Sequence, residues 1–233
     1  MHQRGFFDSR TRAQAAVMAG EVYVDGGLVD KPGTRMKPDC KIDIRPRGSK
    51  FVSRGGLKLE GALEDLKVPV KGKVVLDVGA STGGFTDCLL KNGAGKVYAL
   101  DVGYGLIDQK LRDDPRVVVM EKVNIRNARK DMFNESPQLA VVDVSFISLK
   151  LVLPVLKSLD IESVLTLVKP QFEAGRAEAS RGKGVIRDAR TRSRTVKNIA
   201  VIAEAVGYRI LGESKSILTG PKGNVEIFLY MKV

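Results

Sequence analysis

The spacing of hydrophobic residues along this chain changes near residue 73. Beyond it, short apolar runs alternate with longer segments in which apolar residues recur every three or four positions. The runs predict strands over 73–78, 96–101, 117–120, 138–143, 162–168, 208–218 and 225–232, with helices between most of them. This alternation predicts an α/β domain with a seven-stranded, mostly parallel sheet that is covered by helices on both faces. Because only six residues join the last two strands, we expect these strands to pair antiparallel.

The first 46 residues have the pattern of a separate α+β module. Its predicted elements are a helix over 9–20, a hairpin over 21–29 and a third strand over 41–44. Ser9 or Asp8 is a suitable N-cap for the helix, and Gly20 is a suitable C-terminal stop. Asp25 and Gly26, between two short apolar runs, are a strong signal for a hairpin turn. The apolar positions of the helix face one way, so its other face is basic.

These patterns divide the chain into a module over 1–46, a linker over 47–52 and the α/β domain over 53–233. The α/β domain begins with a helix that we expect to be capped near Ser53, because apolar residues recur at helical spacing from Leu59 to Leu66. Lys58 lies beside this apolar stripe. A lone lysine at such a place is usually solvated. A functional role for Lys58 therefore depends on which residues the fold brings near it.

The strongest chemical signal is the stretch from residue 74 to residue 86, where an apolar strand leads into a glycine-rich turn that opens a helix. Such a junction builds a nucleotide-sized crevice, because Gly79, Gly83 and Gly84 let the backbone approach a ligand. Asp101 ends the next strand, at the spacing of roughly 20 residues from which a carboxylate accepts ribose hydroxyls. The turn lacks the G-x-G-x-x-G of dinucleotide sites and the Lys-Ser/Thr of phosphate loops, which disfavours a pyrophosphate ligand. A tight turn without a ligand is the alternative.

Three further polar residues lie at the same edge of the predicted sheet. Asp143 ends the fourth predicted strand, Lys169 follows the fifth, and Glu226 lies at the start of the final antiparallel strand. Ligands of open α/β sheets bind outside the carboxyl ends of the strands, so we expect all three at one mouth, with Lys58 close by. The alternative is that the four residues form two ordinary surface salt bridges.

Charge is unevenly distributed along the chain, whose net charge is +12 at pH 7. Residues 1–60 contain 12 Lys and Arg against 7 Asp and Glu, and residues 176–197 contain 8 against 2. Two basic zones on either side of a more neutral core favour a polyanion that lies across both. A merely solvated basic surface is the alternative.

Composition also excludes several classes of protein. No apolar run approaches the roughly 20 residues of a membrane span, and the first residues have no apolar signal core, so we expect a soluble, cytoplasmic protein. Cys40 and Cys88 are too few for a disulfide framework. With a single histidine in the chain, we expect no metal site.

Motifs along nearly the whole chain resemble those of one family. The helix, Ala-Gly-x-Val, hairpin and basic face of the first module resemble the RNA-binding fold named after ribosomal protein S-four. The later motifs are SRGGLKL from 53, DVGASTGGFTD from 77, LDVGYG from 100, DVSFIS from 143, KPQFE from 169 and GPKGNVE from 220. In this order they look like the TlyA family of ribosomal RNA 2′-O-methyltransferases, an FtsJ-like group whose members often carry the name hemolysin.

The resemblance implies a Rossmann-like fold that uses S-adenosylmethionine (SAM), behind an RNA-binding module. The family's Lys-Asp-Lys-Glu catalytic tetrad falls on Lys58, Asp143, Lys169 and Glu226. Its SAM site falls on Gly79, Ala80, Ser81, Gly83, Gly84, Asp101, Asn124 and Asp143, where Asn124 would meet the adenine edge or, alternatively, cap a loop. RNA contacts are expected from Arg10, Arg12, Arg54, Arg176, Arg181, Lys183 and Arg187. The implied substrate is a cytidine ribose of ribosomal RNA in an assembled ribosomal subunit.

One departure concerns the first module. The family normally has a helix of the type Arg-Leu-Asp-x-x-Leu ahead of an Arg-Gly pair, whereas the sequence given reaches that pair at Arg4 and Gly5. We therefore expect an incomplete or weakened module that lacks its first helix.

The residue types suit the implied reaction. A ribose 2′-hydroxyl is a poor nucleophile at neutral pH, so it benefits from a group that removes or orients its proton. Our hypothesis is that Lys169 faces the hydroxyl, that Lys58 disfavours the protonated form of Lys169, and that the carboxylates hold the two lysines. Since the carboxylates oppose the effect of Lys58, the sequence gives no sign for the net pKa shift. The basic stretch over 175–187 is expected to close over RNA, with an ordinary surface loop as the alternative.

Three other functions fit parts of the sequence. An RNA-binding protein without turnover is disfavoured by the intact tetrad positions. A membrane-lytic hemolysin is disfavoured because there is no apolar span or sustained apolar helix. A small-molecule methyltransferase would leave the basic zones and the first module unexplained. The residues themselves select neither the base nor the ribosomal subunit, and they carry no pattern that sets an oligomeric state.

Overall fold

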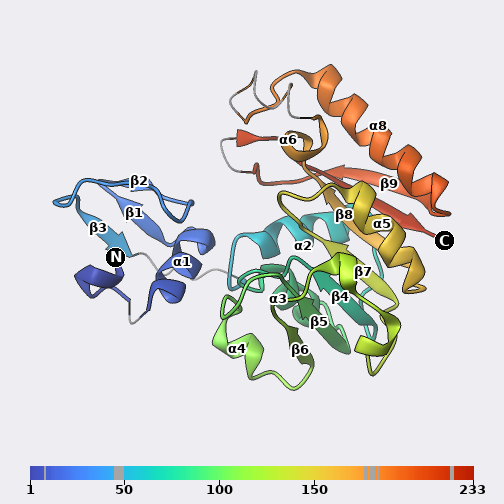
Figure 1. Cartoon of the computed structure of the whole chain (residues 1–233), viewed down its shortest axis with the longest axis horizontal. Coiled ribbons are helices and arrows are strands. Elements are labelled where there is room, and N and C mark those ends of the chain that lie inside the picture. Colours follow the sequence, from blue (N-terminus) through green and yellow to red (C-terminus); the bar gives the residue numbers. More distant parts are fainter. Residues whose placement is uncertain (8, 45–49, 176–177, 179–181, 183, 221–222) are drawn as a thin grey trace.

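The structure is a computed structural model that describes the whole chain except residues 8, 45–49, 176–177, 179–181, 183 and 221–222. It has a small N-terminal module, drawn in blue in Figure 1, beside a larger α/β domain. Predicted strands and observed strands agree within one to three residues at their ends in the α/β domain. The predicted α/β class is therefore confirmed.

The N-terminal module combines one helix with a three-stranded sheet. Its elements are η1 (His2–Arg4), α1 (Arg10–Ala19), β1 (Val22–Val24), β2 (Gly27–Leu28) and β3 (Ile42–Ile44), with the strand order β2-β1-β3. The Ser9 side chain accepts a hydrogen bond from the backbone N–H of Arg12, and Gly20 ends α1 in the left-handed conformation. Ala16, Val17 and Val22 form the centre of a small core. The predicted helix, hairpin and caps are thus confirmed.

Within the described residues, the main sheet has seven strands. They are β4 (Val74–Val78), β5 (Lys96–Leu100), β6 (Val117–Met120), β7 (Leu139–Val142), β8 (Ser163–Val168), β9 (Arg209–Lys215) and β10 (Ile227–Lys232). Their order is β6-β5-β4-β7-β8-β10-β9, and β10 runs antiparallel to both of its neighbours. The antiparallel last pair is therefore confirmed. β9 ends three residues before the prediction because the Ser216 hydroxyl donates to the Leu218 carbonyl and turns the chain.

Helices cover both faces of this sheet (Figure 1). One face carries α2 (Gly55–Asp65), α3 (Gly84–Lys91) and α4 (Gln109–Arg112), and the other carries η2 (Ile125–Asn127), η3 (Lys130–Met132), α5 (Leu149–Ser158) and α8 (Ala189–Ala205). Successive strand residues point to opposite faces, so Val75 packs in the first core and Leu76 in the second. The short helix α6 (Pro170–Glu173) follows β8 directly. Two cores therefore hold the strand ends in fixed positions.

The structure adds two details at the start of the domain. The N-cap of α2 is Arg54, without a side-chain hydrogen bond, instead of Ser53. Ser53 is buried and packs against the start of α3, where a Cβ on Gly84 would meet its hydroxyl at 2.1 Å. Phe51, which the sequence placed in the linker, is 2% exposed within the first core.

Candidate active site

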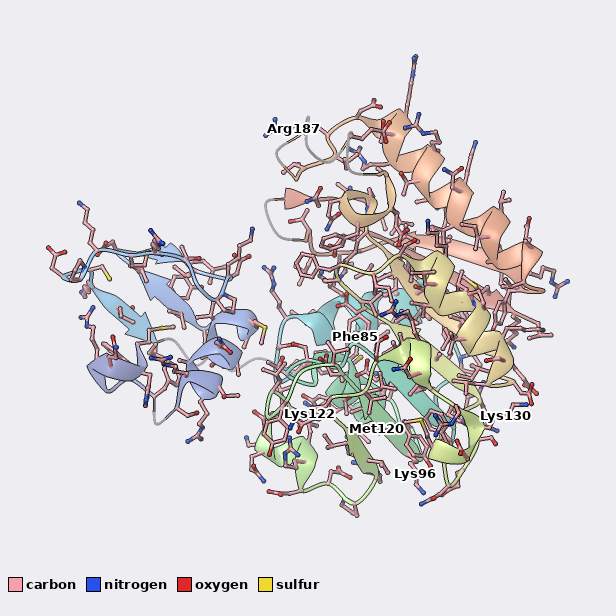
Figure 2. All side chains as sticks on the ribbon, viewed as in Figure 1. Phe85, Lys96, Met120, Lys122, Lys130 and Arg187 are labelled. Carbon is pink, nitrogen blue, oxygen red and sulfur yellow. The ribbon has the colours of Figure 1, made fainter. Side chains whose placement is uncertain are left out.

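A cavity of about 820 Å³ opens at the carboxyl ends of β4, β7 and β8. Its volume is in the range of small-molecule ligand sites. All four residues of the predicted tetrad line it, together with Gly79, Ala80, Ser81 and Gly84 of the glycine-rich turn. Phe85 of α3 gives this wall an apolar part near the centre of the domain (Figure 2). Residues 18 and 30–32 of the N-terminal module complete the rim.

The tetrad residues form two ion pairs. Lys58 Nζ lies 2.6 Å from Glu226 Oε2, and Lys169 Nζ lies 2.5 Å from Asp143 Oδ1. Lys58, Lys169 and Glu226 are all buried, and Asp143 is partly buried. The prediction that these residues share one mouth is therefore matched by their positions, while their catalytic roles stay a prediction.

Strand register explains why distant residues meet here. Ile227 of β10 pairs with Val168 of β8, so the residues just outside this pair, Glu226 and Lys169, emerge at the same edge. In the parallel pair β4 and β7, Val78 lies beside Val142, which brings Gly79 against Asp143. Helix α2 crosses the first face and supplies Lys58 from its second turn.

Electrostatics couple the two pairs. Burial alone would raise the pKa of Asp143, but Lys169 and, more weakly, Lys58 outweigh burial and hold this pKa below its ordinary value. Asp143 therefore stays ionised. The second oxygen of Glu226 accepts from Gln171 Nε2 at 3.2 Å, and Lys169 Nζ also donates to Ser145 Oγ at 3.0 Å.

The glycine-rich turn is shaped mainly by close packing. Gly79 has φ 87° and Gly83 has φ 92°, a backbone region that favours glycine. A Cβ on Gly79 would meet the Asp143 carbonyl at 2.7 Å, and a Cβ on Gly83 would meet Leu111 at 2.2 Å. The sequence explained these glycines by the approach of a ligand, and close packing within the protein adds a second reason for them.

Asp101 ties the turn to the end of β5. Its Oδ2 accepts from the backbone N–H of Ser81 at 2.8 Å, and its Oδ1 accepts from the backbone N–H of Gly103 at 2.7 Å. Each carboxylate oxygen keeps a further lone pair for a ligand hydroxyl. Asp101, Gly83 and Asn124 lie outside the cavity lining. The Asn124 side chain accepts from the backbone N–H of Arg126 at 3.0 Å, the alternative that the sequence left open.

A buried acid lies under the turn. Asp77 of β4 is 0% exposed, and its Oδ2 accepts from the Thr86 hydroxyl at 2.7 Å. Its Oδ1 has no hydrogen-bond partner among the described residues. Burial raises the pKa of Asp77 to about 7, although the bond from Thr86 acts in the opposite direction.

The predicted RNA-binding residues that the structure describes differ in their surroundings. Arg10, Arg12 and Arg187 are exposed. Arg54 instead pairs with Asp30 of the N-terminal module at 3.3 Å and lines the cavity. The predictions for Arg176, Arg181 and Lys183 lie outside the described residues.

Phe146 and Asn224 are among the cavity residues that sequence reasoning missed. Phe146 is 91% exposed with φ 67°, and its ring lies 5.0 Å from the ring of Phe172. An exposed aromatic side chain held in a strained backbone is a feature of binding sites. Asn224 is 2% exposed and also lines the cavity. Both residues lie inside motifs that resemble those of the TlyA family, DVSFIS from 143 and GPKGNVE from 220. Membership of these motifs was the signal from which they could have been found.

No helix among the described residues is both long and apolar enough to cross a membrane. Over the same residues, no three His, Cys, Asp or Glu side chains form a group that would hold a metal ion.

Comparisons with known proteins agree with this geometry. The FtsJ-like methyltransferase family model matches residues 51–233, and the S4 domain model matches residues 1–39. YqxC of Bacillus subtilis, which carries the provisional name of an rRNA methyltransferase, is 46% identical over 98% of this chain and 82% of its own length. The 16S/23S rRNA (cytidine-2′-O)-methyltransferase TlyA of Mycobacterium tuberculosis is 43% identical over 99% of this chain and 87% of its own length.

A solved structure of a hemolysin-named protein from Streptococcus thermophilus superposes with a TM-score of 0.77. It is 40% identical, and the match covers 99% of this chain and 85% of the other. The order of the strands, the matched models and these relatives lead to one assignment. This chain belongs to the FtsJ-like methyltransferase family, in the branch whose members carry an S4 domain ahead of the methyltransferase domain.

Proposed function

We propose that this chain transfers a methyl group from SAM to the 2′-hydroxyl of a cytidine ribose in ribosomal RNA. The observation that carries the proposal is the convergence of two lysine–carboxylate pairs, one buried and one partly buried, and the glycine-rich turn on one cavity. The relative from M. tuberculosis is named for this reaction on 16S and 23S rRNA, which supports the same class of substrate. We infer a cytoplasmic enzyme whose partners are ribosomal RNA or ribosomal subunits.

The turn between β4 and α3 suits the cofactor. We assign the ribose of SAM to Asp101, because two backbone N–H groups already fix the direction of its carboxylate. The proposed cofactor site further includes Gly79, Ala80, Ser81, Gly83, Gly84, Asn124 and Asp143. When bound, SAM supplies a methyl group that its positively charged sulfur makes electrophilic. The side-chain oxygen of Asn124 already caps η2, so we rank the assignment of Asn124 to the cofactor below the other assignments.

Lys169 is the residue that we assign to the acceptor hydroxyl. Two of the positions around its Nζ are taken by Asp143 Oδ1 and Ser145 Oγ, which fixes the direction of the remaining one. In its neutral form, Lys169 would orient the 2′-hydroxyl through that position and take up its proton, as the oxygen bonds to the methyl carbon and the bond from that carbon to the SAM sulfur breaks. The pair of Lys58 and Glu226 supports this arrangement from the other side. Alignment of the hydroxyl supplies a large part of the expected rate gain.

The N-terminal module and the basic zones are the proposed RNA-binding parts. We propose boundaries of 1–46 for the module and 53–233 for the methyltransferase domain, although Phe51 already packs with the latter. Arg10 and Arg12 on α1 and Arg187 beyond the cavity are exposed cations that suit phosphate contacts. Salt dependence of RNA binding should fall when they are replaced.

The test is transfer of labelled methyl groups from SAM to purified small and large ribosomal subunits that lack the modification. The product is mapped to base or ribose by its resistance to alkaline cleavage. Lys169→Ala should bind SAM normally but lose transfer. Lys71→Ala is the matched control, because Lys71 is exposed and precedes β4 at the opposite end of the sheet.

Ribose methylation that depends on Lys169 would establish the reaction and name the subunit. Full activity of Lys169→Ala with normal SAM binding would refute the role of Lys169. Absence of SAM binding by the unaltered chain would refute the proposed function as a whole.

A further inference from the structure

Asn224 is a buried amide that binds the backbone of a segment far away in the sequence. It is 2% exposed. Its Oδ1 accepts from the backbone N–H of Ile186 at 3.0 Å, and its Nδ2 donates to the carbonyl of Gly184 at 2.9 Å. The side chain thus uses both its acceptor and its donor on one short stretch of backbone, as a neighbouring strand would.

A second side chain holds the same stretch from another side. Arg192 Nη1 donates to the carbonyls of Ile186 at 3.2 Å and Arg187 at 2.6 Å. The Ile186 side chain is 5% exposed, which anchors the stretch in the domain. Residues 184–187, which we call the clamped segment, are therefore fixed although they have no regular secondary structure.

The clamped segment lies at the edge of the candidate active site. Gly184 and Asn224 line the same cavity as Lys169 and Glu226. The backbone carbonyl of Asn224, two residues before Glu226, also accepts from the backbone N–H of Gly220 at 2.8 Å. Arg187, at the end of the clamped segment, is exposed and points away from the body of the domain (Figure 2).

We propose that Asn224 is a positioning residue for the RNA substrate: it holds the clamped segment so that Arg187 presents its guanidinium to an RNA phosphate beside the acceptor ribose. This inference rests on the proposed function. The clamp fixes the backbone that carries Arg187, so less conformational freedom is lost when its guanidinium binds a phosphate. Nothing in the sequence assigns Asn224 such a role, because the residue is defined by a contact across 38 positions.

The expected magnitude follows from the two hydrogen bonds. Each bond of this kind shifts a local equilibrium by roughly 3- to 10-fold. If Asn224→Ala leaves the clamped segment in place for only a tenth to a fifth of the time, the dissociation constant for RNA rises by about 5- to 10-fold. SAM affinity and the turnover number at saturating RNA should change by less than about twofold, since neither depends on Arg187.

The experiment measures three quantities in Asn224→Ala, Arg187→Ala and the double variant of the full chain. They are the affinity for ribosomal subunits, the turnover number, and hydrogen exchange of the Ile186 amide. Asn92→Ala is the matched control, because Asn92 also donates its amide to a backbone carbonyl, that of Cys88 in α3. Exchange at Ile186 reports on the clamp even if the chain has a different substrate.

We expect fast exchange at Ile186 in Asn224→Ala but not in Asn92→Ala, with weaker RNA binding in Asn224→Ala. In the background of Arg187→Ala, the second substitution should cause no further loss of affinity. Additive losses would overturn the proposal, because Asn224 would then act independently of Arg187. A lower turnover number with unchanged RNA affinity would also overturn it, since Asn224 would then act on Glu226. Absence of methyl transfer by the unaltered chain would count against the proposed function alone. The RNA affinities of the variants would then still test whether Asn224 positions Arg187.

Discussion

Removing one partner of the Lys58–Glu226 pair should destabilise the fold far more than removing both. The side chains are 8% and 0% exposed, and their charged atoms lie 2.6 Å apart. Lys58→Met keeps the length of the side chain but leaves the Glu226 carboxylate with Gln171 Nε2 as its partner at 3.2 Å. A buried charge without its counter-ion costs about 3–5 kcal/mol. For a chain of this size, a loss of about 3 kcal/mol lowers the melting temperature by about 6–12 °C.

The double variant Lys58→Met with Glu226→Gln separates stability from catalysis. Replacing a buried ion pair by neutral groups of similar volume is often close to neutral, so we expect its stability within about 1 kcal/mol of the unaltered chain. Its methyl transfer should remain lost, because both charged groups are gone. Urea unfolding with equal slopes for all variants gives the free energies of unfolding.

A matched control comes from an exposed pair at the opposite end of the sheet. Lys96, labelled in Figure 2, pairs with Glu135, and their side chains are 26% and 54% exposed. Lys96→Met should leave stability and methyl transfer nearly unchanged, because solvent screens such pairs. Two results would refute the reasoning: Lys58→Met as stable as the unaltered chain, or a double variant whose loss equals the sum of the single losses. Full methyl transfer by the double variant would show that the Lys58–Glu226 pair has a structural role and no role in catalysis.

Three further predictions concern the cofactor side of the cavity. Asp101→Ala should weaken SAM binding by at least about 10-fold, because the hydrogen bonds from the ribose hydroxyls to the fixed carboxylate are lost. Calorimetry measures this affinity, and an unchanged value would show that the ribose does not bind Asp101. Gly79→Ala should lower both stability and SAM affinity, since its Cβ would lie 2.7 Å from the Asp143 carbonyl at φ 87°; a melting temperature equal to that of the unaltered chain would contradict this. Asp77 has a folded-state pKa raised from 3.8 to about 7, so the folded chain binds the extra proton and loses stability as pH rises through this range. Asp77→Asn should remove that loss, and its stability relative to the unaltered chain should rise between pH 4 and about 7; a difference independent of pH would show that Asp77 does not titrate there.

Sequence reasoning succeeded where the position of a residue follows from strand ends. Apolar runs fix where β7 and β8 stop, and the rule for open sheets places Asp143 and Lys169 at one edge. Glu226 was placed correctly because a short connection forces β10 to run antiparallel, which brings its start to that edge. These predictions depend on hydrophobic pattern and topology alone.

Sequence reasoning failed where the answer depends on which side chains touch. Glu226 meets Lys58 across 168 positions, and no local pattern states that Asp143 takes the other lysine. Arg54 pairs with Asp30 of the N-terminal module, a contact that no local pattern predicts. The cap of α2 was predicted near Ser53; Arg54 takes this position, and Ser53 packs against α3. Each of these contacts is set by tertiary packing, which overrides the local preference of the residue.

The two ion pairs are better understood as one charged unit than as two independent contacts. Asp143 is held ionised by both lysines, and Glu226 reaches across to Gln171 in the turn that follows Lys169. The unit has two positive and two negative side chains, so it can be buried at the edge of a cavity without a net charge. Removing any member leaves the other three with an uncompensated charge and changes the surroundings of Lys169. Loss of activity in a single variant therefore measures disruption of the unit, and only paired replacements such as the one at Lys58 and Glu226 separate the chemical role of a residue from its part in this balance.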